Sequence, residues 1–452
     1  MSVSEHAGCQ HSCATPRPYG GRLRWPIKCQ GVGDSAYQPG GQDKGRSLGQ
    51  QRTISAGIEE RDAATPAMGS TLTPWQLRSG YFWYYAAIGA FAPFIPLYYQ
   101  DLGMSGLQLG VLLALPAFWT ALTGAIWGAV ADSLAIHRML LRIVLLVAAV
   151  VALLLSMPGR FLTLLPFVAL LALAIVPIPP LLDGYAVSVA ERSKSSFGGL
   201  RVWGSIGFTV MVLVLGRLLG GQLTDRFLYA YALCLLLTWL SIFGLPRLAE
   251  RRPRPLLDGL QAVRRSRPFL LLLFVAYLMS SGFAVLNNLL SIHVRDMGGS
   301  TQVIGLVFAV ASVSEFPILI FSGWLMTRIG ARGMVTVALA MWVVRFAILS
   351  FVSAPWLVVG AQSLHGVTFG AFLIASVTLA HRFVGQENAA TAQAALATMS
   401  WGFGSITGAI AAGSLLDVAG TYTIFRGVTA LMLVTLAVFI VGNRVISIEG
   451  NG

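Results

Sequence analysis

Twelve long apolar runs follow one another along the chain from Leu77 onward. A helix of about 20 apolar residues crosses the hydrocarbon core of a bilayer. In lipid, a helix satisfies its own backbone hydrogen bonds, so runs of this length favour helical spans. The runs cover residues 77–100, 107–131, 138–157, 162–189, 199–221, 225–246, 268–293, 302–326, 333–353, 356–381, 390–416 and 421–442. We therefore predict an all-α membrane protein with twelve transmembrane helices.

The composition excludes most other classes of protein. Charged residues make up 11% of the chain, whereas soluble domains average about 25%. Four cysteines are too few for a disulfide scaffold. The chain has no P-loop, and no metal-ligand cluster or nucleophile with a base stands out in the membrane part. We expect neither an enzyme nor an ATP-driven pump, with no metal and no bound cofactor, and a proton gradient as the energy source.

Residues 1–74 differ from the rest, because they are polar and lack the apolar core of a signal peptide. We predict a disordered cytoplasmic N-terminal extension, unless translation starts at Met68. Cys9, Cys13 and Cys29 lie here with histidines, but their spacing does not fit a common zinc finger.

Basic residues are distributed unevenly between the two sides of the predicted membrane. With both termini inside, and with residues 1–74 left aside, sixteen Lys and Arg residues fall on the inner side and five on the outer side. Seven of the sixteen lie in the linker 247–267. This bias predicts a multi-pass plasma membrane protein with both termini in the cytoplasm.

The two halves of the membrane part contain an internal repeat. The segment from Tyr99 to Ser105 matches Val294 to Ser300 at an offset of 195 residues, and Gly110 matches Gly305 at the same offset. We predict two pseudo-symmetric six-helix bundles, 75–246 and 268–442, joined by the basic cytoplasmic linker 247–267 and followed by a short cytoplasmic tail, 443–452. This design is typical of transporters whose halves rock around a central site.

The loop after the second span of each half strengthens this interpretation. The matching positions are Gly128, Asp132 and Arg138 in the first half, and Gly323, Arg328, Gly330 and Arg332 in the second. They resemble the signature loop of the major facilitator superfamily, although Thr327 replaces the acidic residue in the second copy. The resemblance implies that these are conformational gating loops. The alternative is that each is an ordinary short turn.

Five ionisable residues lie within predicted spans: Asp183, Arg201, Glu315, Arg345 and His365. Each costs at least about 2.5–3.5 kcal/mol at mid-membrane on insertion scales, so each is a candidate for a functional role. Arg201 can bind carboxylates or paired hydroxyls through two parallel hydrogen bonds, and Asp183 is a suitable partner for it when the site is empty. The alternative is a purely structural ion pair.

The run from Phe197 to Phe208 carries a closer resemblance. It resembles the phenylpropionate permease and lactose permease-like group of proton symporters, including the 18-residue separation of Asp183 from Arg201. The resemblance implies that these two residues contact substrate, and Trp203 lies in the same run. Phe208 stands where lactose permease has a tryptophan that stacks on sugar. This difference makes a galactoside a poorer expectation here and an apolar or aromatic solute easier to accept.

The second half carries the candidates for proton coupling. Arg345 and His365 are 20 residues apart, which matches an arginine and a histidine of lactose permease, and Glu315 resembles its membrane glutamate. That group's proton-carrying acid and its lysine are replaced by Thr368 and Gln362. We expect Glu315 to be the first proton site and His365 the second. The alternatives are a permanent Glu315–Arg345 ion pair and a hydrogen-bonded core histidine. Asn287 is polar enough to line the cavity.

These features favour a secondary active transporter. We expect proton-coupled symport of a small organic solute, an aromatic acid, a nucleoside or a saccharide, by alternating access in a monomer. One alternative is proton-antiport efflux of lipophilic compounds, although the fifth span lacks the proline that efflux members usually carry. A non-transporting receptor or scaffold is a further alternative, but it would not need buried charges.

Overall fold

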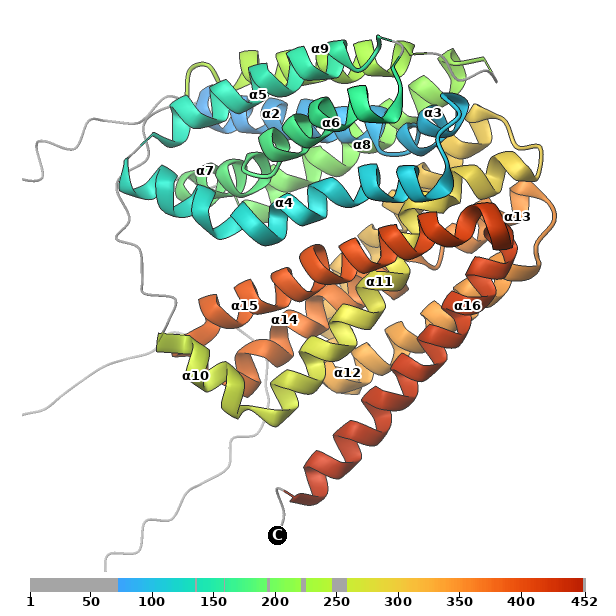
Figure 1. Ribbon diagram of the computed structural model, residues 1–452. Coiled ribbons are helices and arrows are strands. Elements are labelled where there is room, and N and C mark those ends of the chain that lie inside the picture. Colours follow the sequence, from blue (N-terminus) through green and yellow to red (C-terminus); the bar gives the residue numbers. More distant parts are fainter. Residues whose placement is uncertain are drawn as a thin grey trace, which may run out of the picture. The chain divides into compact units, whose positions relative to one another are not determined.

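The computed structural model describes residues 72–134, 136–157, 159–192, 196–220, 225–245 and 258–449. Helices make up almost all of these residues, and no strand occurs among them (Figure 1). The predicted N-terminal extension, with its cysteines, lies outside the described residues almost entirely, and so does the first part of the predicted linker.

The first bundle contains eight helical segments that form six spans. They are α2 (Leu72–Phe91), α3 (Ile95–Asp101), α4 (Gly106–Ser133), α5 (His137–Leu154), α6 (Phe161–Ile175), α7 (Ile178–Arg192), α8 (Phe197–Leu218) and α9 (Arg226–Ser241). Pro93 lies in the break between α2 and α3, and Pro177 precedes α7. Proline lacks the backbone N–H that a helix interior requires. The helices α2 and α3 therefore form one broken span, and so do α6 and α7.

The second bundle contains several segments that run into one another. They are α10 (Asp258–Arg265), α11 (Arg267–Asp296), α12 (Thr301–Phe351), α13 (Pro355–Gln362), η1 (Gly366–Gly370), α14 (Ala371–Val384), η2 (Gln386–Asn388), α15 (Ala389–Ala397), η3 (Thr398–Gly404) and α16 (Ser405–Glu449). Gly330 and Gly420 interrupt α12 and α16 with φ values of 67°. This left-handed conformation favours glycine and turns the chain without a longer loop.

The prediction of twelve spans is confirmed. Eight apolar helical stretches in the described residues are long enough to cross a membrane. Two of them, with 51 and 58 residues, are broken at Gly330 and Gly420 and hold two spans each. The α2–α3 pair and the shorter apolar helix α9 complete the twelve. Part of the predicted linker is helical in α10, and α16 continues to Glu449 into the predicted tail.

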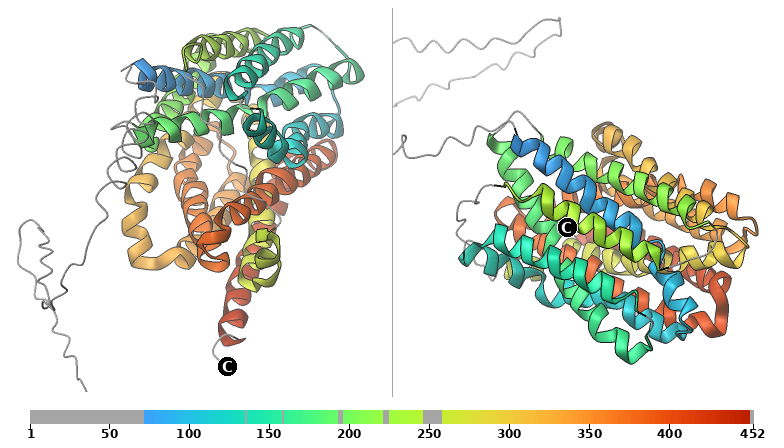
Figure 2. Two further views of the ribbon diagram at one scale, coloured as in Figure 1. Left: turned by 90° about the vertical axis from the view of Figure 1, so that its left-hand side faces the viewer. Right: turned by 90° about the horizontal axis from the view of Figure 1, so that it is seen from above.

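The two bundles meet along two helix pairs, α4 with α16 and α8 with α12 (Figure 2). Paired glycines allow both crossings. A Cβ on Gly110 would lie 2.7 Å from the Ala409 carbonyl oxygen, and a Cβ on Gly305 would lie 2.6 Å from the Val212 carbonyl oxygen. Contacts this close require residues without side chains.

Hydrogen bonds across the bundles gather at the same end of the spans. The Gly106 N–H donates to Asp417 Oδ2 over 2.7 Å, and Thr301 Oγ1 donates to the Gly216 carbonyl over 2.9 Å. Arg295 Nη1 donates to Asp101 Oδ1 over 2.5 Å, and its Nη2 donates to Gln100. We call this the closed end, and we call the Arg295 and Asp417 bonds the closed-end latch.

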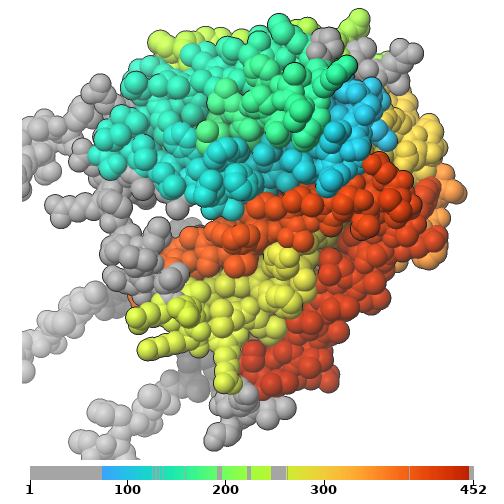
Figure 3. All heavy atoms as spheres, viewed as in Figure 1, coloured from blue at the N-terminus to red at the C-terminus, as the bar shows by residue number. Residues whose placement is uncertain are grey.

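The opposite end of the spans, where α4 ends at Ser133 and α8 begins at Phe197, is called the open end. Within the described part of the chain, no hydrogen bond joins the two bundles there. The space-filling view shows a hollow between the two bundles on this side (Figure 3).

The glycine crossings predict a matched pair of mutants. Gly413→Leu should force the closed end apart, because a Cβ there would lie 2.3 Å from the Gly106 carbonyl oxygen. Gly427→Leu should leave the closed end unchanged, because a Cβ there meets nothing within 4 Å. Ser291 is buried at the closed end, where it donates to the Pro93 carbonyl. Maleimide labelling of a Ser291→Cys reporter should therefore accelerate only in the Gly413 variant. Equal labelling in both variants would contradict the crossing.

Candidate functional site

The first polar cluster lies inside the N-terminal bundle. Asp183 on α7 accepts a 2.6 Å hydrogen bond from the Tyr81 hydroxyl of α2 and pairs with Arg201 of α8 at 3.2 Å. The predicted pairing of Asp183 and Arg201 is therefore present in the geometry. The structure adds Tyr81 as a third member, which holds the carboxylate from the buried side.

Close packing of α2 against α8 positions this cluster. A Cβ on Gly207 would lie 2.0 Å from the Phe82 carbonyl oxygen, and a Cβ on Gly204 would lie 2.7 Å from the Tyr85 ring. The two glycines therefore let α2 press against α8. The Arg201 guanidinium then lies 5.9 Å from the centre of the Tyr85 ring, within range of a cation–π contact.

The cluster remains accessible to solvent. The Arg201 side chain is 47% exposed and that of Asp183 is 33% exposed, although both lie in spans of the bundle. Among the described residues, only Nη1 of Arg201 forms a hydrogen bond. Because a guanidinium carries five N–H donors, the others can reach a solute in the hollow.

The second polar cluster is a chain of side chains in the C-terminal bundle. Glu315 Oε1 of α12 lies 3.0 Å from His365 Nε2, and His365 Nδ1 lies 3.0 Å from Arg345 Nη1. The Arg345 guanidinium is almost fully buried and also donates to Thr368 Oγ1 and Gln362 Oε1. The predicted trio is thus together, with the histidine between the two charges. No direct Glu315–Arg345 hydrogen bond occurs among the described residues.

The hydrogen bond with Arg345 determines which group of the Glu315–His365–Arg345 cluster can accept a proton. A guanidinium only donates, so His365 Nδ1 must accept, and neutral His365 carries its proton on Nε2. That N–H donates to Glu315. A proton added to His365 would have to break the bond with Arg345. A proton added to the second carboxylate oxygen of Glu315 leaves every described hydrogen bond intact.

A close approach of backbones brings Glu315 and His365 together. A Cβ on Gly366 would lie 1.9 Å from the Ser314 carbonyl oxygen, and the Gly366 N–H donates to Ser314 Oγ over 2.9 Å. The π-helical turn η1 begins at the same glycine. Single π-turns of this kind occur frequently at functional sites.

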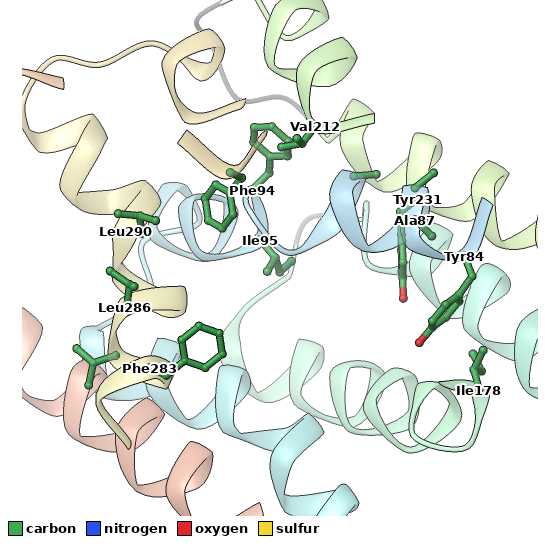
Figure 4. Packing of buried hydrophobic residues seen from close by; sticks show 14 of the residues in the cluster. Tyr84, Ala87, Phe94, Ile95, Ile178, Val212, Tyr231, Phe283, Leu286 and Leu290 are labelled. Atoms are coloured by element: carbon green, nitrogen blue, oxygen red, sulfur yellow. The ribbon is translucent and has the colours of Figure 1, made fainter. Parts of the chain in front are cut away.

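Aromatic rings pack around His365. Phe369 stacks on His365 with ring centres 5.4 Å apart, and Phe283 of α11 stacks on Phe369 at 4.9 Å. Trp401 from the second π-helical turn, η3, meets Phe283 and Phe369 edge-on and is 42% exposed. Figure 4 shows Phe283 on α11, with Leu286 and Leu290 further along the same helix. We call Phe283, Phe369 and Trp401 the aromatic wall.

The two clusters lie on helices that cross. Arg201 is on α8, and Glu315 is on α12. Their helices, α8 and α12, also form one of the closed-end crossings, and Thr209 Oγ1 donates to Ser312 Oγ over 3.1 Å between them. A movement of one bundle against the other would therefore change the distance between Arg201 and Glu315.

The other predicted binding residues lie outside these clusters. Trp203 packs edge-on against Trp75, with ring centres 6.3 Å apart. Phe208 is half-buried, and its backbone lies against Gly89. Asn287 is exposed on α11, one helical turn from Phe283 of the aromatic wall. Sequence reasoning did not assign roles to Tyr81 or to the aromatic wall. For Tyr81, the indication in the sequence is its spacing of four residues from Tyr85, which puts both rings on one face of the helix.

The predicted gating residues lie at the open end. Gly128 and Asp132 fall in the last turns of α4, and Arg138 in the first turn of α5. Gly323 is in open space on α12, and Gly330 forms the break within α12. Arg328 lies over the Trp324 ring at 5.8 Å, and Arg332 over the Phe383 ring at 5.8 Å. Their role in gating stays a prediction.

Comparisons with known proteins agree with this architecture. A family model described as "MFS_1 like family" matches residues 74–427. The "Maltose permease" of Geobacillus stearothermophilus is 27% identical over 365 residues, which cover 78% of this chain and 92% of that protein. The "Multidrug resistance protein MdtG" of Salmonella paratyphi A is 29% identical over 316 residues, 65% of this chain and 76% of that protein. The crystal structure of the nucleoside transporter NupG aligns with a TM-score of 0.74 at 19% identity, over 82% of this chain and 99% of that one.

The close approach of Gly366 to the backbone of α12 at Ser314 predicts a second matched pair of mutants. Gly366→Ala should lower the free energy of unfolding by about 1–3 kcal/mol, because the new methyl group overpacks against α12. Gly360→Ala in the same span should be neutral or stabilising by about 0.5–1 kcal/mol, since a Cβ there meets nothing within 4 Å. Thermal unfolding of the purified proteins in one detergent measures both. Equal stability of the two variants would contradict the described approach.

Proposed function

Because this chain belongs to the MFS_1-like family of transporters, we propose that it carries a neutral, hydroxyl-rich solute together with a proton. The chain is a multi-pass membrane transporter and not an enzyme. The observation that carries the proposal is that the two bundles each hold a polar cluster in their spans, Glu315–His365–Arg345 in one and Asp183–Arg201 in the other. One cluster contains a group that can accept a proton, and the other offers donors and an acceptor to a solute.

The charge of the site supports a neutral solute. Arg201 and Arg345 balance Asp183 and Glu315, and His365 is neutral in the tautomer that Arg345 imposes. A carboxylate solute at Arg201 would place an uncompensated negative charge next to Asp183. Hydroxyl groups can donate to Asp183 and accept from Arg201 without displacing either. We therefore favour a saccharide or a nucleoside over an aromatic acid.

The aromatic wall supports a solute with a ring. Aromatic faces pack against the apolar face of a sugar and stack on a nucleobase. The names of two similar proteins, a maltose permease and a nucleoside transporter, fall in the same two classes. The exposed ring of Trp401 is the member of the wall that we assign to solute contact.

The charge bias supports one orientation of the protein in the membrane. The ratio of sixteen basic residues to five supports an open end in the cytoplasm, with both termini, in a plasma membrane. The structure then corresponds to the inward-open state.

Because each chain contains both clusters, we expect a monomer to be sufficient. Protonation of Glu315 and binding of solute favour closure of the open end and release of the closed-end latch.

The proposal is tested by uptake into proteoliposomes with an imposed pH gradient, acidic outside. Maltose, a nucleoside, phenylpropionate and a lipophilic cation form the panel. Accumulation of maltose or the nucleoside, lost when an ionophore collapses the gradient, is the expected result. Accumulation of phenylpropionate alone would contradict the neutral-solute assignment. Gradient-driven export of the cation alone would contradict symport and support efflux.

Arg201 should be required for solute binding. Arg201→Lys removes the planar fork but keeps the charge. Loss of one charge-assisted hydrogen bond costs about 1.5–3 kcal/mol, so affinity should fall about tenfold or more. Equilibrium binding of the transported solute measures the change, and Arg444→Lys on the exposed end of α16 is the control. Equal affinity in the two variants would remove Arg201 from the site.

Glu315 should be required for proton coupling but not for solute exchange. Glu315→Gln keeps an oxygen that accepts from His365 Nε2, but it cannot titrate. Wild-type uptake should fall as the outer proton concentration falls, whereas exchange by the variant should not depend on pH. Uphill accumulation should be lost in the variant. Glu387→Gln, on the exposed η2 turn, should behave as wild type. Uphill accumulation by Glu315→Gln would exclude this residue as the proton carrier.

A further inference from the structure

His293 is a second membrane-embedded histidine, and the mechanism proposed above does not use it. It lies near the end of α11 with no exposed surface. Its Nε2 is 3.0 Å from the Leu349 carbonyl oxygen, and its Nδ1 is 2.9 Å from Thr421 Oγ1. The rings of Tyr422 and Phe425 pack edge-on against it, each with centres 4.7 Å apart.

The partners of His293 determine where its protons lie. A carbonyl oxygen only accepts, so Nε2 carries a proton in every state. In neutral His293 the Nδ1 lone pair therefore accepts from the Thr421 hydroxyl. Thr421 Oγ1 also lies 3.3 Å from Asp296 Oδ2. The hydroxyl has one proton and two acceptors, so it can donate to His293 or to Asp296, but not to both at once.

This arrangement connects a buried imidazole to the surface. Asp296 is exposed at the closed end. A protonated Asp296 can donate to Thr421 Oγ1 while the Thr421 hydroxyl gives its own proton to His293 Nδ1. The carboxylic acid becomes a carboxylate, the hydroxyl is restored with its O–H bond turned, and the imidazole becomes an imidazolium. The imidazolium then donates to Thr421, and Thr421 donates to the Asp296 carboxylate.

The relay lies within the closed-end latch. Arg295, adjacent to Asp296, forms the bond to Asp101 of the other bundle. Thr421 follows the Gly420 break, and Asp417 on the preceding turn accepts from the Gly106 N–H of the other bundle. The residues that form the latch in this bundle, Arg295 and Asp417, are therefore within four positions of Asp296 and Thr421 in the sequence.

We propose that His293 is a second proton-binding site, separate from the Glu315–His365 pair, and that its protonation through Asp296 and Thr421 strengthens the closed-end latch. When His293 is neutral, Thr421 donates to it, and the Asp296 carboxylate competes with Asp101 for Arg295. When His293 is charged, Thr421 donates to Asp296 and draws this carboxylate towards the imidazolium. Arg295 is then left to Asp101 and Gln100.

The charged and titratable groups at this end of α11 and of the elements packed against it come from three elements of its bundle and one of the other. They are Arg295 and Asp296 on α11, Arg345 one turn before Leu349 on α12, Asp417, Tyr422 and Arg426 on α16, and Asp101 on α3. Asp296 is the carboxylate that Thr421 joins to His293, so the relay predicts that variants of Asp296 and Thr421 mimic those of His293.

The test is a spin-label distance measurement across the closed end of the full-length protein in nanodiscs, without solute. Labels on Met157→Cys and Trp356→Cys, in a background without other cysteines, use side chains that are 62% and 64% exposed. Between pH 8 and pH 4 the ratio of closed to open populations should rise at least about fivefold, the lower range of ordinary coupling between sites. His293→Gln, Asp296→Asn and Thr421→Val should each abolish this rise, and Thr421→Ser, which keeps the hydroxyl, should retain it.

Three results would overturn the proposal. One is a wild-type distance distribution that does not change with pH. Another is a full response in both Asp296→Asn and Thr421→Val, whose folding does not depend on the buried imidazole. The last is a response lost in Glu315→Gln but kept in His293→Gln, which would assign the effect to the central pair. Because no transport is measured, failure here is distinguishable from failure of the proposed symport.

Discussion

A guanidinium buried between membrane-spanning helices constrains the rest of the site. Arg345 is 1% exposed, and an unpaired charge in such a place would cost several kcal/mol. Gln362, Thr368 and His365 supply its acceptors, all from the tenth span. Because the bond to Arg345 occupies His365 Nδ1, the histidine has one tautomer and donates to Glu315. Glu315 is then the member of the chain whose charge can change without rearrangement.

The connection between this chemistry and movement lies in the helices that carry it. Arg201 is on α8 and Glu315 on α12, and the same two helices cross at the closed end through Gly216 and Gly305. A rocking motion about that crossing alters the separation of the two charged groups. In the proposed symport, protonation of Glu315 would remove a negative charge from the site that also holds Arg201, and this would couple proton binding to solute binding.

Much of the architecture was predictable from the sequence, for identifiable reasons. Span length predicted the helices, and the 195-residue repeat predicted the two bundles. The rarity of charge in spans singled out Asp183, Arg201, Glu315, Arg345 and His365, and the structure groups them as two clusters. Trp203 shares its run with Arg201 but faces Trp75, because residues two apart lie on different sides of a helix.

Other features depend on tertiary packing and could not be predicted. Phe283, Phe369 and Trp401 come from three separate spans, and nothing in their spacing brings them together. The π-helical turns that begin at Gly366 and Thr398 depart locally from the α-helical period. The sequence of these segments is that of an ordinary α-helix, so it does not indicate the turns. A repeat that is similar in both halves also gives no indication of which end of the bundles is closed.

The most direct measurement of coupling is proton movement driven by the solute alone. Proteoliposomes with equal pH on both sides and a pH-sensitive dye inside would receive an inward gradient of the transported solute. Wild-type protein should acidify the interior in step with solute entry, and Glu315→Gln should admit solute by exchange without acidification. Solute entry by the wild type with no change of internal pH, or undiminished acidification by Glu315→Gln, would contradict proton symport through this carboxylate.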